Sequence, residues 1–285
     1  WIGRAARPGY GYDEGHAFTL TDSPDETEER FFKPHRVLED VTTHIESDIA
    51  LQWLLLELMS TGWNTPHEIE AYIKEMLYWE QMERIGAWGR QRDNRDQRLN
   101  DRLRETANWL EEHAFVIEKD TAREFEPTAL GDGSVEFSFN SFVSAPLSSL
   151  RTFYDWLEET PHEDVTPLRL IDRVARQFDK SMNVSESDVN PELQGLLQEH
   201  DLPIDAPAIT AGVVYWYWMS NFDNTEIETR AGIDPTYLPS TTRKLSDTVD
   251  ATKYLMNASP NARKPDWFDS IVFRLERGVR SEEVP

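Results

Sequence analysis

The chain has 285 residues, enough for two or three modest domains. Its 29 Lys and Arg against 53 Asp and Glu give a formal net charge of −24, and such acidity ordinarily argues against nucleic-acid binding, because phosphate neutralisation drives that affinity. The chain contains no cysteine, which excludes disulfides, thiolate catalysis and zinc fingers, and no apolar run approaches the roughly 18 residues of a membrane span.

Residues 1–30 are predicted to be the end of an α/β domain. They carry two arginines, Arg4 and Arg7, separated by two alanines. This spacing puts two planar, permanently charged guanidinium groups on one side of the chain, where they suit a phosphate whose charge develops during transfer. A surface turn with two solvated arginines is the alternative.

Residues from about 31 to 147 are predicted to form a winged-helix domain, in which three helices precede a β-hairpin. The first helix has apolar residues at the spacing of a buried face: Leu51, Leu54, Leu55, Leu58 and Met59. Thr65, Pro66 and Glu68 predict an N-cap and a capping box at the start of the second helix. The third helix has an apolar face of Leu99, Leu103, Ala107 and Leu110. Two β-prone runs, 114–118 and 124–128, predict the hairpin.

An arginine-rich segment lies within this domain. Between Arg84 and Arg104 there are seven arginines and three aspartates, a local basic excess in a strongly acidic chain. One interpretation is a phosphate-contacting or docking surface. The other is a solvated segment in which arginines and aspartates pair.

Residues from about 148 to 285 are predicted to be mostly helical. A helix that opens at Pro167 carries basic residues at i, i+4, i+7 and i+11, opposite an apolar face: Arg169, Arg173, Arg176 and Lys180. This basic ridge could follow the backbone of a nucleic-acid strand, or it could be an ordinary polar face.

The segment from Ile209 to Asn221 is rich in aromatic residues and apolar around its whole circumference. A cluster that dense rarely stays exposed, so it predicts a buried central helix rather than a base-stacking platform. A further helix is predicted at about 241–257.

Several stretches resemble archaeal superfamily 2 DNA repair helicases related to the helicase half of DNA polymerase theta. Residues 1–10 resemble the family motif Gln-x-x-Gly-Arg-Ala-Gly-Arg, with Ala6 in place of the usual glycine and the glutamine falling just before Trp1. Residues 127–131 resemble the Ala-Thr-x-Leu-Gly that closes the family's winged helix. Residues 251–258 resemble the core of its ratchet helix. The loop expected from 132 to 146 diverges from the family.

The resemblance implies a fold that is mainly α, in three parts: residues 1–30 as the remnant of a RecA-like α/β lobe, 31–147 as a winged helix that acts as a hinge, and 148–285 as a helical ratchet bundle. By this resemblance, Arg4 and Arg7 sense the ATP γ-phosphate, and Tyr254 stacks on single-stranded DNA bases. The family's basic partner of that aromatic is replaced by Asp247, and Arg243 and Lys244 are the candidate substitutes. A packed core tyrosine is the alternative for Tyr254.

The implied function is that of a C-terminal part of an ATP-dependent helicase that moves 3′ to 5′ on single-stranded or forked DNA. ATP and Mg²⁺ belong to the full-length protein together with its missing RecA-like lobes. The chain has no Gly-x-x-x-x-Gly-Lys-Ser/Thr loop, so this piece alone is expected to bind no ATP and to have no ATPase activity. A related RNA helicase and a non-enzymatic winged-helix protein that binds DNA or a protein partner remain as alternatives.

Only seven of the 29 basic residues are lysine, and this surplus of carboxylates resembles the proteins of haloarchaea. At 1 M salt, charges are screened within about 3 Å, so the acidic total then says little about partners. The histidines are scattered, and no metal site is predicted. We expect a soluble, cytoplasmic protein.

Overall fold

The computed structural model describes residues 47–75, 95–119, 124–141, 145–178, 190–231, 236 and 238–280. The chain divides into two units, Trp1–Thr43 and His44–Pro285, and every described residue belongs to the second unit. The predicted RecA-like remnant, with Arg4 and Arg7, lies outside the described residues. The described part is mainly helical, as predicted, and its strands form a two-stranded sheet.

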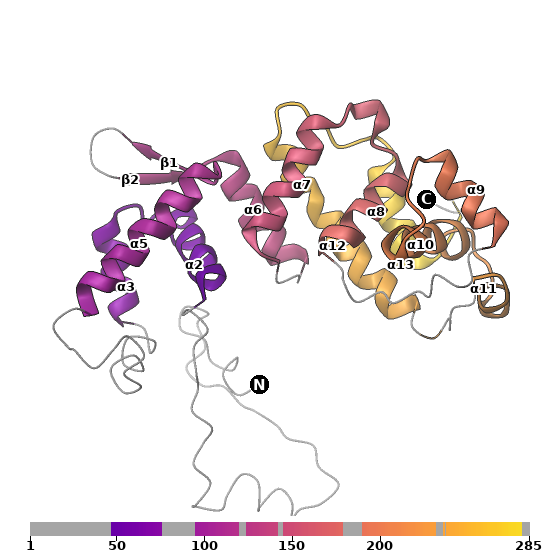
Figure 1. The fold of residues 1–285 in the computed structure, drawn as a ribbon, viewed down its shortest axis with the longest axis horizontal. Coiled ribbons are helices and arrows are strands. Elements are labelled where there is room, and N and C mark those ends of the chain that lie inside the picture. The colour runs from indigo at the N-terminus through magenta and orange to yellow at the C-terminus, as the bar shows by residue number, and fades with distance from the viewer. Residues whose placement is uncertain are drawn as a thin grey trace, which may run out of the picture. The chain divides into compact units, whose positions relative to one another are not determined.

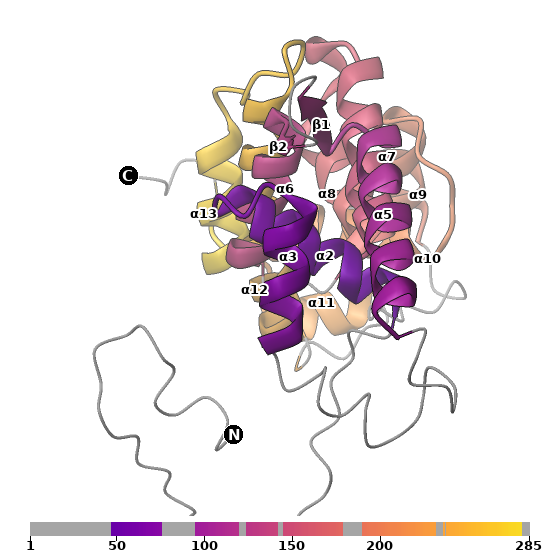
Figure 2. The ribbon, with the colours of Figure 1, turned by 90° about the vertical axis from the view of Figure 1, so that its left-hand side faces the viewer.

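The first elements have the order predicted for a winged helix. They are α2 (Asp48–Ser60), α3 (Pro66–Glu75), α5 (Arg95–Glu112), β1 (Val116–Lys119) and β2 (Glu124–Pro127). The strands pair antiparallel, with Val116 opposite Pro127. Figure 2 shows α2, α3 and α5 gathered on one side of the hairpin's base.

Local sequence signals account for these elements. The hydroxyl oxygen of Thr65 accepts a hydrogen bond from the Glu68 amide (3.3 Å), and a Glu68 carboxylate oxygen accepts one from the Thr65 amide (3.2 Å), so the predicted capping box is confirmed. The apolar face of α2 packs against that of α5 in one core. The buried residues of α2 are Leu51, Leu55, Leu56, Leu58 and Met59.

The next segment differs from the prediction of a loop over 132–146. Helix α6 (Ala129–Ser141) occupies most of it, and α7 (Leu147–Glu159) follows. Two glycines, Gly131 and Gly133, lower the helix propensity of this segment by about 1 kcal/mol each. They are tolerated because α6 packs too closely for side chains at those positions. A Cβ on Gly131 would lie 2.1 Å from the carbonyl oxygen of Phe115.

The remaining elements form a bundle of helices (Figure 1). They are η4 (His162–Asp164), α8 (Pro167–Phe178), α9 (Pro191–Glu199), α10 (Ala206–Val213), the π-helical η6 (Val214–Trp218), α11 (Asn224–Ala231), α12 (Leu238–Ala258) and α13 (Phe268–Arg277). Helix α12 packs against α6, α7, α8 and α13, so it lies at the centre of the bundle. Its buried side includes Leu245, Val249 and Leu255.

The aromatic segment after Ile209 is largely buried, as predicted. Tyr217 is fully buried, and Trp218 donates its indole N–H to the carbonyl oxygen of Leu275 at 2.9 Å. The backbone changes from α to π at Val214, and Tyr215 and Trp216 in this π-helical stretch are half-buried. In the described ranges, no helix is both long enough and apolar enough to cross a membrane.

Candidate nucleic-acid interface

Arg176, one of the predicted strand-contacting arginines, forms ion pairs within the protein. Its Nε lies 2.8 Å from Oδ2 of Asp172, one turn earlier on α8. Its two terminal nitrogens each donate to a carboxylate oxygen of Asp205 at 2.7 Å. Asp205 is the N-cap of α10 and also accepts a hydrogen bond from the Ala208 amide. The guanidinium therefore fastens α8 to the start of α10 in a bidentate geometry.

The electrostatics of this cluster follow from the geometry. Hydrogen bonds from Arg176 hold the pKa of Asp205 below its usual value. Burial raises the pKa of Asp172, although the same guanidinium partly offsets that effect. The carboxylates also raise the pKa of Arg176, which is charged in any case. A phosphate would have to displace two carboxylates to reach this side chain.

The other two ridge arginines also contact the protein itself. Arg169 donates from Nε to the carbonyl oxygen of His200 at 3.2 Å. Arg173 donates to the carbonyl oxygen of Thr152 at 3.1 Å, and its guanidinium carbon lies 5.7 Å from the centre of the Trp156 ring. Burial lowers the pKa of Arg173. This geometry favours the ordinary polar face, although a role of the three arginines in nucleic-acid binding stays a prediction.

The predicted stacking residue, Tyr254, lies near the C-terminal end of α12. Its side chain is half-buried, so it is neither fully packed in the core nor fully exposed. The ammonium nitrogen of Lys253 lies 5.2 Å from the centre of its ring. That lysine also pairs with Asp250 at 2.7 Å. A partly accessible ring beside a cation is compatible with stacking on a base.

The candidate phosphate contacts, Arg243 and Lys244, are exposed near the start of α12, and neither forms an ion pair with a described residue. Arg243 is eleven residues before Tyr254, so both lie on nearly the same side of the helix. Asp247 and Asp250 lie between them on that side. Burial raises the pKa of Asp247, the nearby charge of Arg243 partly offsets that effect, and Glu276 and Asp250 raise the pKa further. Arg243 and Tyr254 thus share one face of α12 with two carboxylates between them, whereas Lys244 lies about 80° away around the helix.

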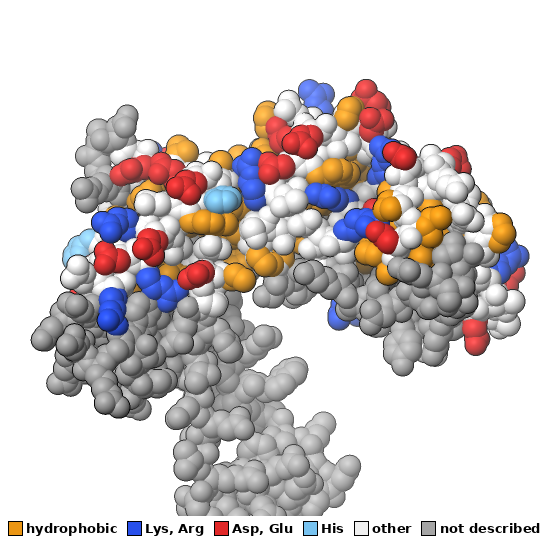
Figure 3. All heavy atoms as spheres, in the orientation of Figure 1, with side chains coloured by type: hydrophobic (Ala, Val, Ile, Leu, Met, Phe, Trp, Pro, Cys, Tyr) orange, Lys and Arg blue, Asp and Glu red, His pale blue; other side chains and the backbone are white. Residues whose placement is uncertain are grey.

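The arginine-rich segment is described only in part, because residues 76–94 lie outside the described residues. In α5, Arg102 pairs with Asp48 at 2.9 Å and Arg104 pairs with Asp101 at 3.1 Å, while Arg98 is exposed. These pairs match the interpretation of a solvated segment laced with Arg–Asp contacts. Figure 3 shows the same tendency more widely, since basic and acidic side chains are interspersed over the face in view.

A cavity of about 430 Å³ opens between α2, α3, α5 and the hairpin of β1 and β2. Its lining includes the apolar side chains of Leu55, Met59 and Phe125 and the charged residues Asp101, Arg104 and Glu118. The volume lies within the range of roughly 300–1,000 Å³ that is typical of ligand-binding cavities. The sequence pattern did not indicate this cavity, because its lining comes from five separate elements, α2, α3, α5, β1 and β2.

A charge asymmetry along the chain was also missed. Residues 238–280, which form α12, α13 and their connection, carry eight Lys and Arg and five Asp and Glu, a net +3 in a chain of net −24. Some of this charge is used internally: Arg274 donates to the carbonyl oxygen of Met219 at 3.3 Å, and Arg280 donates to that of Ser220 at 3.0 Å. Counting charges in windows along the sequence would have found the excess.

Within the part of the chain that the structure describes, no group of three or more His, Cys, Asp or Glu side chains is arranged to hold a metal ion. Comparison with models of known protein families finds none that matches this sequence. No curated protein matches the chain either.

Proposed function

We propose that the chain works as part of an ATP-dependent superfamily 2 DNA helicase that acts on single-stranded or forked DNA. The observation that carries this proposal is α12, a long helix at the centre of the bundle with the half-buried Tyr254 near one end and the exposed Arg243 and Lys244 near the other. The preceding winged-helix order and the Arg-x-x-Arg stretch support it through the family resemblance.

In this proposal, α12 grips a single strand. The ring of Tyr254 stacks on a base, and Arg243 and Lys244 contact phosphates. Arg4 and Arg7 belong to the ATP cleft of the complete protein, where ATP and Mg²⁺ supply the energy for translocation. Both arginines lie outside the described residues, so their part in the proposal rests on the sequence motif.

Binding of a fluorescent oligothymidylate, measured by anisotropy, tests the proposal. Base–aromatic stacking contributes about 1–3 kcal/mol, so Tyr254→Ala should weaken binding about 5- to 150-fold. Tyr254→Phe keeps the ring and should bind nearly as wild type does. Tyr215→Ala removes another half-buried tyrosine and serves as the matched control.

Salt dependence tests the phosphate contacts separately. Arg243→Gln and Lys244→Gln should each lower the slope of log affinity against log salt by about 0.7, the value for one phosphate contact on a single strand. Folding is checked by circular dichroism at each KCl concentration. Equal affinity of wild type and Tyr254→Ala, with unchanged salt slopes, would contradict the proposal. Oligonucleotides of DNA and RNA with one base sequence separate a DNA helicase from an RNA helicase.

A non-enzymatic winged-helix protein is the second candidate, and the cavity between the winged-helix elements favours it. Such a protein would use the hairpin and α5 for duplex DNA or the cavity for a partner. It predicts tighter binding to duplex than to single-stranded DNA, weakened by Arg98→Gln and indifferent to Tyr254→Ala.

A further inference from the structure

Helix α6 makes backbone contacts on two opposite sides. A Cβ on Gly131 would lie 2.1 Å from the carbonyl oxygen of Phe115, and one on Gly133 would lie 2.8 Å from the carbonyl oxygen of Tyr254. Two positions apart on an α-helix correspond to a rotation of about 200°, so the two contacts lie on opposite faces. Helix α6 is therefore held between the hairpin of the winged helix and the end of α12 that carries Tyr254.

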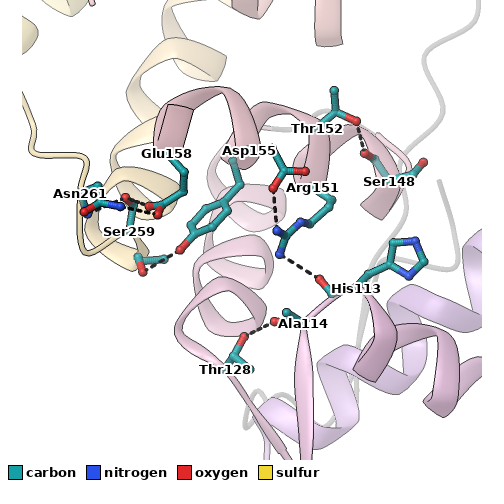
Figure 4. Close-up of polar contacts among 12 residues, drawn as sticks. His113, Ala114, Thr128, Ser148, Arg151, Thr152, Asp155, Glu158, Ser259 and Asn261 are labelled. Carbon is teal, nitrogen blue, oxygen red and sulfur yellow. Dashed lines mark hydrogen bonds and ion pairs between the residues drawn. The ribbon is translucent and has the colours of Figure 1, made fainter. Parts of the chain in front are cut away.

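The start of α6 is fixed to the turn between α5 and β1. The Thr128 hydroxyl donates to the carbonyl oxygen of Ala114 at 2.6 Å, as Figure 4 shows, and accepts from the Gly131 amide at 3.1 Å. The hydroxyl of Ser60, the last residue of α2, also donates a hydrogen bond to the Asp132 carboxylate in the first turn of α6 at 3.1 Å. These bonds leave the first turn of α6 little freedom to rotate against the winged helix.

Helix α7 links the same two places through its side chains. Arg151 donates to the carbonyl oxygen of His113 at 3.2 Å and pairs with Asp155 at 2.6 Å. One turn later, the Tyr154 hydroxyl donates to the carbonyl oxygen of Ala258 at 3.3 Å, at the last residue of α12. Figure 4 shows Arg151 between Asp155 and the carbonyl oxygen of His113.

Glu158 completes the link at the end of α12. It accepts hydrogen bonds from the Ser259 hydroxyl and, at 2.8 Å, from the side-chain amide of Asn261. The Ser259 oxygen accepts in turn from the Ala262 amide at 2.7 Å. The chain that leaves α12 is thus fastened to α7 immediately after the helix ends.

From these contacts we infer that α6 and α7 form a rigid connector, which makes the winged helix and the last turns of α12 move as one body. The two close contacts of α6 end on the backbone carbonyls of Phe115 and Tyr254, so rotation of one side chain cannot relieve a displacement there, and close-packed interiors transmit such displacements. Gly133, Arg151 and Glu158 are then positioning residues for Tyr254. Their meaning for DNA rests on the function proposed for Tyr254. A winged helix coupled in this way places the stacking site and is not a free hinge against α12.

Hydrogen exchange of the full chain, followed by mass spectrometry without DNA, tests the coupling. Arg151→Met removes the bond to His113 and the ion pair with Asp155, and it leaves in place the side chains of Tyr154 and Glu158, which bond to the end of α12 and the residues after it. We expect amide exchange to become about five- to tenfold faster at residues 113–118 and also at 254–262. Losing one or two hydrogen bonds lowers the free energy of local opening enough to raise the exchange rate by that factor. Glu158→Gln, made at the other end, should produce faster exchange at both places as well.

Arg104→Met is the matched control, because Arg104 pairs with Asp101 on its own helix and should leave residues 254–262 unchanged. Gly133→Ala tests the close contact directly, with Gly195→Ala as the control glycine, since a Cβ there meets no atom within 4 Å. If Gly133→Ala does not fold, the Arg151 and Glu158 variants still test whether the two regions are coupled. Faster exchange confined to the mutated end in both variants would overturn the coupling.

A DNA readout separates this inference from the proposed function. Oligothymidylate added to wild type should slow exchange at 254–262 and also at 113–118. In Arg151→Met it should slow exchange at 254–262 alone. If oligothymidylate changes neither region but the exchange effects without DNA are found, the proposed function fails and the connector stands. Slowing at 254–262 alone in wild type overturns the connector and leaves the proposed function intact.

Discussion

Arg176 illustrates what side-chain periodicity leaves open. Its spacing from Arg169 and Arg173 predicts a basic ridge, but its main partner, Asp205, is 29 residues away in sequence. The side chain of Asp172 is almost completely buried, so its charge depends on the guanidinium for compensation. A charge that appears available in the sequence is thus already bound to two carboxylates in the fold.

We predict that Arg176→Met destabilises the protein by about 3 kcal/mol, because removing one member of a buried ion pair leaves the others uncompensated. The wild-type cluster also has a pH signature. Asp205 has a lowered pKa, so its contribution is present above its unfolded value near 3.8 and is lost as pH falls through the lower folded value. Asp172 has a raised pKa and opposes this, because protonation relieves its burial cost.

Urea unfolding at pH 7, 5 and 3.5 measures both effects. The variant should lose most stability at pH 7, and its difference from wild type should shrink toward acid pH as the Asp205 contribution is lost. Arg169→Met, which breaks bonds to carbonyl oxygens and no ion pair, is the control and should keep the wild-type pH dependence. A pH-independent difference for Arg176→Met would contradict the assignment.

At the scale of elements, local signals identified α2, α3, α5, α8 and α12 and failed at α6. The capping box at Thr65 and the apolar face of α5 involve residues within a turn or two of each other, and both are found as predicted. Helix α6 was missed because Gly131 and Gly133 argue against a helix, whereas close approach to Phe115 and Tyr254 requires them. Thr128, which caps α6, was the available signal for a helix start.

The start of α3 gives a test at this scale. Thr65→Ala removes the hydroxyl that accepts from the Glu68 amide, and replacing an N-cap threonine costs about 1 kcal/mol. Hydrogen bonds from Thr65 lower the pKa of Glu68, so that pKa should return toward its ordinary value in the variant, as measured by NMR titration. Thr152→Ala, at an exposed site within α7, should change stability little. An unchanged Glu68 pKa would show that the box does not form in solution.

At the scale of the whole molecule, the net charge of −24 dominates. Self-repulsion of like charges destabilises a compact state, and salt screens it over a Debye length that falls from about 10 Å at 0.1 M to about 3 Å at 1 M. The excess is concentrated outside residues 238–280, which carry a net +3. Salt should therefore act mainly on the repulsion among the other elements.

We predict that the melting temperature rises by about 5 °C or more between 0.1 and 2 M KCl, equivalent to a gain of about 1–3 kcal/mol for a chain of this size. Differential scanning calorimetry measures it. Sucrose at matched osmolality is the control, since it strengthens burial by exclusion without screening charge. Equal effects of KCl and sucrose, or a melting temperature that falls with KCl, would refute the role of charge repulsion.

Caps and apolar periodicity act between residues a few positions apart, so they were enough to predict the mainly helical class and the positions of α2, α3, α5, α8 and α12. The pairing of Arg176 with Asp205, the close approach of α6 to α12 at Gly133 and the partial burial of Tyr254 came from the folded structure alone. The reason is physical: side-chain accessibility and pairing depend on which distant segments pack together, and periodicity along one segment carries no information about its partners.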